Sequence, residues 1–271
     1  MLNDIFAGLE KFGMRSVLEK NTDIYHQAAT DNKPLKETLA KRFSIDDYIY
    51  AKNFVCAVCD QSFKSYVVKH GKTRVESVEF DLRPIHTPIE PMLYDVVMCT
   101  SCGFTSLNAV FNKITRREAE KVLEEITPHF KPEPPSKEPT IDMAIDRYKL
   151  ALLNAVVRNA KECEKAYICM RITWLYRIKG EALGDEKKFA ALALQGYTSS
   201  LEKESTNLLK LEEGTILYLM GSFSYFLGDN AASLKILASI IASNKSSHRL
   251  KERARDLRDR IIEEMRKGND K

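Results

Sequence analysis

Two short cysteine motifs decide the fold, Cys56-Ala-Val-Cys59 and Cys99-Thr-Ser-Cys102. This C-x2-C…C-x2-C arrangement is typical of a zinc site, because Zn²⁺ takes four thiolates at the corners of a tetrahedron, each about 2.3 Å from the metal. Asp60 and Gly103 follow the two pairs, at positions where a tight turn needs a positive φ. Four cysteines close the coordination shell, which is typical of a structural site. We predict a Zn²⁺ site whose ligands are Cys56, Cys59, Cys99 and Cys102.

Other chemistries remain open for these cysteines. Two disulfides would need an oxidising compartment, and the first residues do not read as a secretory signal. A redox dithiol would use one pair rather than two, whereas an iron–sulfur cluster also accepts four thiolates, and spacing alone does not separate zinc from iron. His70 and His86 lie between the pairs and are interpreted as turn or surface residues rather than ligands. Cys163 and Cys169 are interpreted as small buried hydrophobic residues.

The residues beside the motifs favour β-structure. Phe54-Val55 leads into the first motif and Tyr94–Met98 into the second, so that each cysteine turn ends a strand, as in a zinc ribbon. The 39 residues between Cys59 and Cys99 exceed the common spacing and leave room for an inserted hairpin. A capping box, Thr115-Arg-Arg-Glu118, marks the start of a helix after the second motif. We therefore predict a small β-rich zinc ribbon with flanking helices.

The inserted hairpin can be placed by its strand-forming residues. Residues 63–69 and 73–80 favour strands, as do residues 92–98. His70-Gly71-Lys72 lies between the first two stretches and contains a turn-forming glycine. The sequence therefore predicts that 63–69 and 73–80 pair with each other through this turn.

A proline-rich segment divides the chain. Five of the nine prolines lie at residues 128–139, where each ring removes a donor and fixes φ. No proline follows Pro139, and the apolar residues then recur every three or four positions, which predicts an all-helical region. The predicted parts are an N-terminal helical arm at 1–47, a zinc-ribbon domain at 48–127, a linker at 128–139 and a helical domain at 140–271. The predicted fold class is α+β.

The helical region contains two similar units. Tyr167–Gly180 with 187–201 and Ile216–Gly228 with 230–243 both read as helix–turn–helix pairs. The second unit resembles a tetratricopeptide repeat, which predicts a helical hairpin array closed by a polar helix at 246–267. Trp174 is interpreted as a packing residue between helices. We predict that a concave face of the array binds a protein or peptide partner. The residues assigned to that face are Arg171, Tyr176 and Arg177.

Charge and hydropathy narrow the classes of function. Forty-two basic and 38 acidic residues give a net charge of +4, and residues 245–271 carry that whole excess. Dedicated nucleic-acid binders usually show a stronger basic bias. The chain also lacks the roughly 20 consecutive apolar residues that a membrane-spanning helix needs. We therefore expect a cytoplasmic protein without a membrane span.

Two further functions remain as alternatives. The first is nucleic-acid binding by the ribbon, because residues 63–83 place basic residues beside Phe63, Tyr66 and Phe80, and aromatic rings between basic residues suit base stacking. The second is an enzyme with a site between the two halves. The sequence offers no pattern that would place a nucleophile beside a base, which favours a non-enzymatic function.

The order of these motifs resembles an uncharacterised bacterial family, a domain of unknown function. The resemblance covers roughly residues 45–245 and is most specific at Cys56-Ala-Val-Cys59, Leu93–Phe104 and Trp174-Leu-Tyr-Arg177. It implies an N-terminal zinc-ribbon-like region followed by tetratricopeptide-like helices. The family often has proline after the first cysteine of each motif, where Ala57 and Thr100 stand in this chain, and these changes remove no ligand. The leading hypothesis is thus a non-enzymatic zinc-binding scaffold with a protein or peptide partner.

Overall fold

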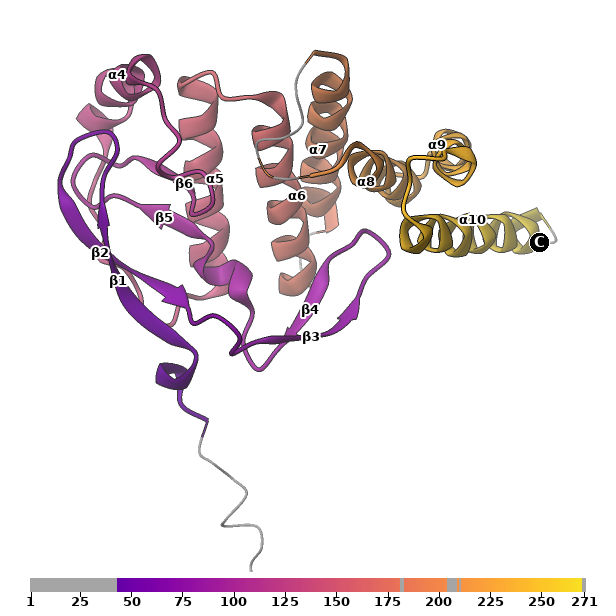
Figure 1. The fold of residues 1–271 in the computed structure, drawn as a ribbon, viewed down its shortest axis with the longest axis horizontal. Helices are drawn as coiled ribbons and strands as arrows, with labels where there is room; N and C mark the ends of the chain where they lie inside the picture. The colour runs from indigo at the N-terminus through magenta and orange to yellow at the C-terminus, as the bar shows by residue number, and fades with distance from the viewer. Residues whose placement is uncertain (1–42, 181–182, 204–208, 210, 270–271) are drawn as a thin grey trace, which may run out of the picture. The chain divides into compact units, whose positions relative to one another are not determined.

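The computed structural model describes residues 43–180, 183–203, 209 and 211–269 of the 271 residues. Ile45–Lys271 forms one compact unit. Small antiparallel sheets come first along this unit and helices follow, so the fold class is α+β, as predicted (Figure 1). The helical arm predicted at 1–47 lies almost entirely outside the described residues.

In the described part of the chain, the β-structure consists of three antiparallel hairpins. Their strands are β1 Ile49–Val55 with β2 Ser62–Val68, β3 Arg74–Val78 with β4 Pro84–Thr87, and β5 Val96–Met98 with β6 Thr105–Leu107. Residues 56–61 connect β1 to β2, and residues 99–104 connect β5 to β6. Each cysteine motif is therefore the turn of a hairpin, with a strand on both sides of it.

The hairpin predicted between residues 63–69 and 73–80 is wrong. β2 pairs with β1 and β3 pairs with β4, while Gly71 adopts a φ of 72° in the connection between the two hairpins. The reason is the position of the apolar side chains, because a strand pairs where it can share a buried face with its partner. Phe63 on β2 stacks on Phe54 of β1, with ring centroids 5.7 Å apart, whereas most residues of β3 are exposed.

The strand predicted at residues 92–98 is shorter than expected. Pro91–Tyr94 forms a 3-10 helix, η3, and only Val96–Met98 is strand. Pro91 favours this start because its fixed φ suits the first helical position. The Glu90 carboxylate caps η3 by accepting from the Met92 N–H at 3.1 Å.

The described helices follow the predicted pattern after the second cysteine motif. They are α4 Arg116–Glu125, α5 Ile141–Val157, α6 Glu162–Lys179, α7 Leu183–Lys203, α8 Glu213–Phe226, α9 Asn230–Ala242 and α10 His248–Asn269, with short 3-10 helices η2 Ile45–Asp47 and η4 Thr127–His129. The predicted capping box is confirmed at α4, where the Thr115 hydroxyl accepts from the Glu118 N–H and the Glu118 carboxylate accepts from the Thr115 N–H. The predicted closing helix corresponds to α10.

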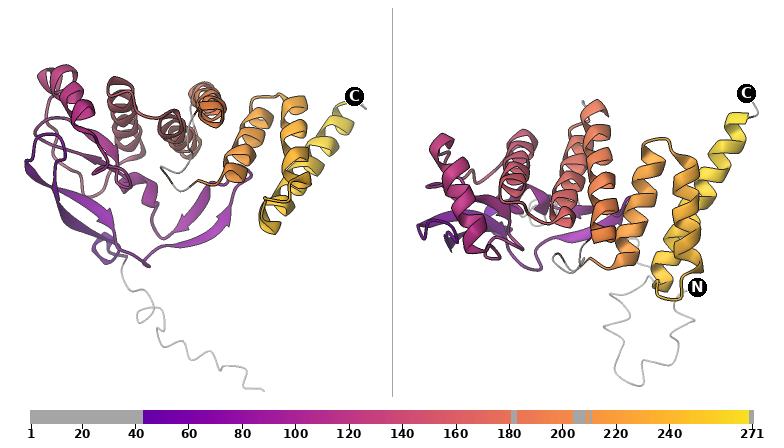
Figure 2. Two further views of the ribbon diagram at one scale, coloured as in Figure 1. Left: turned by 45° about the horizontal axis from the view of Figure 1, so that its top comes forward. Right: turned by 90° about the horizontal axis from the view of Figure 1, so that it is seen from above.

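The two helix–turn–helix units correspond to α6–α7 and α8–α9, and the members of each pair pack against each other (Figure 2). Gly180 ends α6 with a φ of 77°, and its N–H donates to the Tyr176 carbonyl. Gly221 allows close packing of α8 on α9, since a β-carbon added there would lie 3.3 Å from Leu237 Cδ2. The identification of these pairs as tetratricopeptide-like repeats stays a prediction.

The β5–β6 hairpin lies between two clusters of buried residues. Val97 and Phe104 belong to a cluster formed by the four motif cysteines, β1, β2 and α4. Val96 and Leu107 belong to a second cluster formed mainly by α5, α6, α7 and α8. Because neighbouring strand residues point to opposite faces, this short hairpin contributes to both cores.

The proline-rich segment contacts the elements on its N-terminal side. The Phe130 ring lies over Gly103, so that an added β-carbon there would be 2.5 Å from Phe130 Cγ. The Tyr94 hydroxyl donates to the Lys137 carbonyl at 3.1 Å, and the Lys137 ammonium lies 2.7 Å from the Asp46 carboxylate. Packing therefore continues across residues 128–139, and a division into separate domains at this segment stays a prediction.

Candidate metal centre

The two cysteine motifs adopt the same backbone turn. In the first, the Cys56 N–H donates to the Gln61 carbonyl at 3.0 Å and the Asp60 N–H donates to the Cys56 carbonyl at 3.0 Å. In the second, the Cys99 N–H donates to the Phe104 carbonyl at 2.8 Å and the Gly103 N–H donates to the Cys99 carbonyl at 3.1 Å. The positive φ predicted after each pair is confirmed, at 57° for Asp60 and 77° for Gly103.

The turns bring all four sulfur atoms within 4.8 Å of one another. Cys56 Sγ lies 3.6 Å from Cys102 Sγ, and Cys59 Sγ lies 3.7 Å from Cys99 Sγ. Four sulfurs at about 2.3 Å from a tetrahedral ion would be roughly 3.8 Å apart. The predicted cluster is thus assembled, and its geometry could hold a metal ion.

The electrostatics of the cluster also favour a cation. Hydrogen bonds between the thiols raise the pKa of Cys102 and lower that of Cys99, because a thiolate at Cys99 accepts from its neighbours and makes their ionisation harder. The Val58 and Ser101 N–H groups, each 3.4 Å from a sulfur atom, stabilise negative charge on Cys56 and Cys99. Four thiolates at this distance would repel one another unless a bound cation offset their charge.

Buried apolar residues pack against the cluster. Cys56, Cys99 and Cys102 are buried, and Phe54, Phe63, Phe104 and Phe111 pack as an aromatic group beside them. The second turn is also held from outside, because the Thr127 hydroxyl donates to the Cys102 carbonyl and the Asn154 amide donates to the Gly103 carbonyl. These contacts orient the ligands, as the second shell of a structural metal site does.

Cys163, Cys169 and the two histidines between the motifs, His70 and His86, lie outside the group of four cysteines. His70 is exposed, and His86 Nδ1 lies 3.7 Å from the Glu90 carboxylate. Cys163 and Cys169 are buried in the helical core, as predicted for small hydrophobic residues. Burial raises the pKa of the Cys169 thiol to about 12, so this side chain stays neutral.

The three residues predicted to bind a partner are engaged within the chain. Arg171 forms an ion pair with Asp95 at 3.0 Å, and its guanidinium also donates to the Tyr167 hydroxyl. The Tyr176 ring stacks on Phe189 with centroids 5.8 Å apart. Arg177 forms ion pairs with three carboxylates. Peptide binding by these residues stays a prediction.

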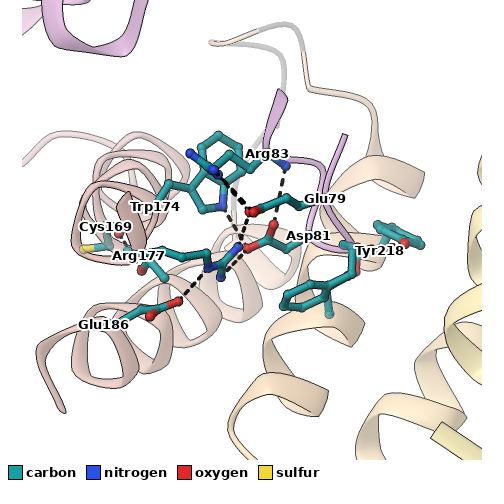
Figure 3. A network of polar contacts seen from close by, with 11 residues as sticks. Glu79, Asp81, Arg83, Cys169, Trp174, Arg177, Glu186 and Tyr218 are labelled. Atoms are coloured by element: carbon teal, nitrogen blue, oxygen red, sulfur yellow. Dashed lines mark hydrogen bonds and ion pairs between the residues drawn. The ribbon is translucent and has the colours of Figure 1, made fainter. Parts of the chain in front are cut away.

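The partners of Arg177 form a polar network that the sequence did not indicate (Figure 3). The guanidinium lies 2.6 Å from Glu79, 2.9 Å from Asp81 and 2.8 Å from Glu186. Burial lowers the pKa of Arg177, but the three carboxylates raise it by a larger amount. The guanidinium therefore remains charged. Asp81 is fully buried and also accepts from the Trp174 indole N–H at 2.9 Å.

This network holds the β3–β4 hairpin turn against the helices. Phe80, between Glu79 and Asp81, packs on Tyr225 and Phe226, and its carbonyl accepts from the hydroxyls of Tyr218 and Ser222. The signal in the sequence was the alternation of charged and apolar residues in Glu79-Phe-Asp-Leu-Arg83, which suits a turn that inserts apolar side chains and pairs its charges. Its partners lie about a hundred residues away, beyond the reach of any local pattern.

The fold and the cysteine cluster together define the class of protein. It is an α+β protein with a candidate metal centre built on two hairpin turns. Residues 49–261 match the family described as "Uncharacterized protein conserved in bacteria (DUF2225)", and the chain belongs to this family. No curated protein and no solved structure matches the chain. Each helix in the described ranges is too short or too polar to span a membrane.

Proposed function

We propose that the chain is a non-enzymatic, cytoplasmic zinc-binding scaffold whose helical region binds a protein or peptide partner. The observation that carries the metal part is the arrangement of four sulfur atoms within 4.8 Å, each pair in the turn of a hairpin. Two cysteine turns of this kind facing each other are the defining feature of a zinc ribbon. The short distances between the sulfur atoms suit a single tetrahedral ion rather than an iron–sulfur cluster, and zinc is the ion that we propose.

The metal in this proposal is structural. Four protein ligands leave no open position for water or substrate, and three of the four cysteines are buried. The ion joins the β1–β2 turn to the β5–β6 turn, beside the aromatic group that already packs against both segments. Binding free energy at such a site is folding free energy, because the unfolded chain has no preformed set of thiolates.

Metal analysis of protein purified under reducing conditions tests this part. We expect one zinc per chain, and its loss in Cys56→Ser and Cys99→Ser. Cys169→Ala is the matched control, because it also removes a buried thiol but lies outside the cluster. A brown protein with iron in place of zinc would exclude zinc, and metal content equal in all four proteins would exclude the cluster as the site.

The proposed scaffold role rests on the helical hairpins. The pairs α6–α7 and α8–α9 pack in sequence and α10 packs on the last pair, an order that suits a tetratricopeptide-like array with a polar closing helix. Such arrays bind peptides through surfaces built from several helices. A stable complex between the full chain and a peptide, lost in variants of helical surface residues, is the expected result.

The alternative of nucleic-acid binding is less well supported. Phe63 packs in the aromatic group beside the cysteines, and Phe80 packs on Tyr225 and Phe226, so neither ring can stack on a base. Arg83 is paired with Glu79 at 2.8 Å. The predicted patch thus loses two of its aromatic rings and one of its free cations.

A further inference from the structure

A groove lies between α5 and the segment that follows α4. Its volume is about 560 Å³, within the range of roughly 300–1,000 Å³ that is typical of ligand sites. The lining is mainly apolar. The apolar lining residues are Met98, Ile126, Phe130, Met143, Leu150 and Leu153. We refer to this feature as the α4–α5 groove.

Apolar surface continues out of the groove along α5. Leu153 is 50% exposed although it lines the groove, and Val156, three residues later on the same helix, is 52% exposed. Residues three apart on a helix lie on neighbouring parts of one face. Contiguous exposed apolar surface of this kind marks interaction sites, and its extent beyond the groove favours a polypeptide over a small molecule.

The polar feature of the groove is Arg147. Its guanidinium is partly buried among apolar residues, and burial lowers its pKa. Within the part of the chain that the structure describes, it forms neither a hydrogen bond nor a salt bridge, and the nearest acidic influence is the more distant Glu133. Three other arginines with little exposure, Arg158, Arg171 and Arg177, all pair with a carboxylate. Arg147 is therefore a partly buried cation that no carboxylate of the described residues pairs with.

The rim of the groove carries charges of both signs. Glu125, Glu133 and Asp146 are exposed, as are Lys131 and His129. Solvent screens these exposed charges far more than it screens a cation inside an apolar groove. A matching ligand thus has an acidic group opposite Arg147, and mixed or basic charge at its edges.

We propose that the α4–α5 groove binds an amphipathic helix of a partner protein, with an acidic side chain paired to Arg147 and large apolar side chains on Met98 and Leu150. Met143, Arg147, Leu150 and Leu153 follow one another along α5 over eleven residues. Such a stripe is about 15 Å long and matches three turns of a partner helix. This inference rests on the proposed scaffold function and assigns that function to a different surface from the one around Arg177.

Selection from a phage library of 14-residue peptides, with apolar residues at helical spacing and all other positions random, tests the proposal on the full chain. Enriched peptides should carry Asp or Glu within the apolar face. Fluorescence anisotropy should then show binding at least tenfold weaker to Arg147→Gln and to Leu153→Ser. Leu183→Ser is the matched control, because it removes a similarly exposed leucine from α7, outside the groove, and should leave affinity within twofold.

A charge reversal makes the test independent of folding. Arg147→Glu should lose the enriched peptide and bind its variant with Lys in place of the acidic residue. Peptides that bind wild type, Arg147→Gln and Leu153→Ser equally would overturn the groove assignment and leave the scaffold function intact. Failure to enrich any peptide would overturn the scaffold function itself, and with it this inference.

Discussion

Replacement of Arg177 by methionine removes the cation at which three carboxylates meet. Arg177 and Arg83 supply two positive charges, whereas Glu79, Asp81 and Glu186 supply three negative charges. The network therefore has one carboxylate more than it has guanidinium groups. Arg177→Met would leave those three carboxylates with one cation, but Asp81→Asn would balance the charges and keep the size of the side chain.

The two substitutions should differ strongly in their effect on the free energy of unfolding. Removing one partner of a buried ion pair typically lowers that free energy by about 3–5 kcal/mol, because the other charge stays buried without compensation. Asp81 has no exposed surface, so the loss of unfolding free energy caused by Arg177→Met should lie in this range. Asp81→Asn keeps an oxygen for the Trp174 N–H and weakens only charged hydrogen bonds, each worth about 1.5–3 kcal/mol, while it relieves the excess negative charge. Its net effect should be below about 2 kcal/mol.

Thermal unfolding followed by tryptophan fluorescence measures both effects at the site itself, because Trp174 is the only tryptophan and bonds to Asp81. We expect Arg177→Met to lower the thermal midpoint by roughly 6–20 °C, on the scale of about 2–4 °C per kcal/mol for a chain of this size. The double variant with Asp81→Asn should be more stable than Arg177→Met alone. Arg255→Met, which removes an exposed pair on α10, is the control and should leave the midpoint unchanged. Equal effects of Arg177→Met and Asp81→Asn would refute this account of the network.

Three further outcomes can be measured by the same unfolding assay. Gly103→Ala should lower stability by more than about 2 kcal/mol, because a left-handed φ disfavours alanine by about 1–2 kcal/mol and the Phe130 ring blocks the added methyl group. Gly71 has a similar φ but open space around it, so Gly71→Ala should show the backbone effect alone. Thr115→Ala should lower stability by about 1 kcal/mol through loss of the capping box, whereas Thr198→Ala, in the middle of α7, should not. Burial raises the pKa of Glu79 and Glu118, but hydrogen bonds from Arg83 to Glu79 and from Thr115 to Glu118 outweigh it and both values lie below normal. Their stabilisation is therefore complete above the ordinary glutamate pKa of about 4.3 and is lost as the pH falls through the lower folded values, so a stability unchanged between pH 5 and pH 3 would contradict these pairings.

The cysteine cluster could be predicted because its geometry is local. Two cysteines three residues apart already determine a tight turn, and the residue after each pair must tolerate a positive φ, as Asp60 and Gly103 do. The same reasoning carried further would have placed a strand on both sides of each turn, since the turn reverses the chain. The strand predicted at Phe54-Val55 is confirmed as the end of β1, but its extension back to Ile49 could not be predicted, because only Ile49 and Phe54 of the seven residues are buried and no alternation marks the rest.

Other features depend on contacts between distant segments. The β3–β4 pairing includes Pro84 and a shift of register between Val75 and Ser77, and neither feature favours a strand in a local window. Glu79 and Arg177 lie 98 residues apart, so no spacing rule connects them. In the sequence alone Arg177 cannot be told from an exposed binding residue, because the three carboxylates that pair with it come from other elements.

The position of the β5–β6 hairpin explains how a metal at the cysteines would affect the helices. One face of the hairpin carries Val97 into the cysteine core, and the other carries Val96 and Leu107 into the helical core. The Asn154 amide of α5 also donates to the Gly103 carbonyl inside the second cysteine turn. An ion that fixes this turn therefore fixes the hairpin, and the hairpin is part of the surface on which α5 packs. Since α5 also forms one wall of the α4–α5 groove, the metal and the proposed partner would stabilise the same helix.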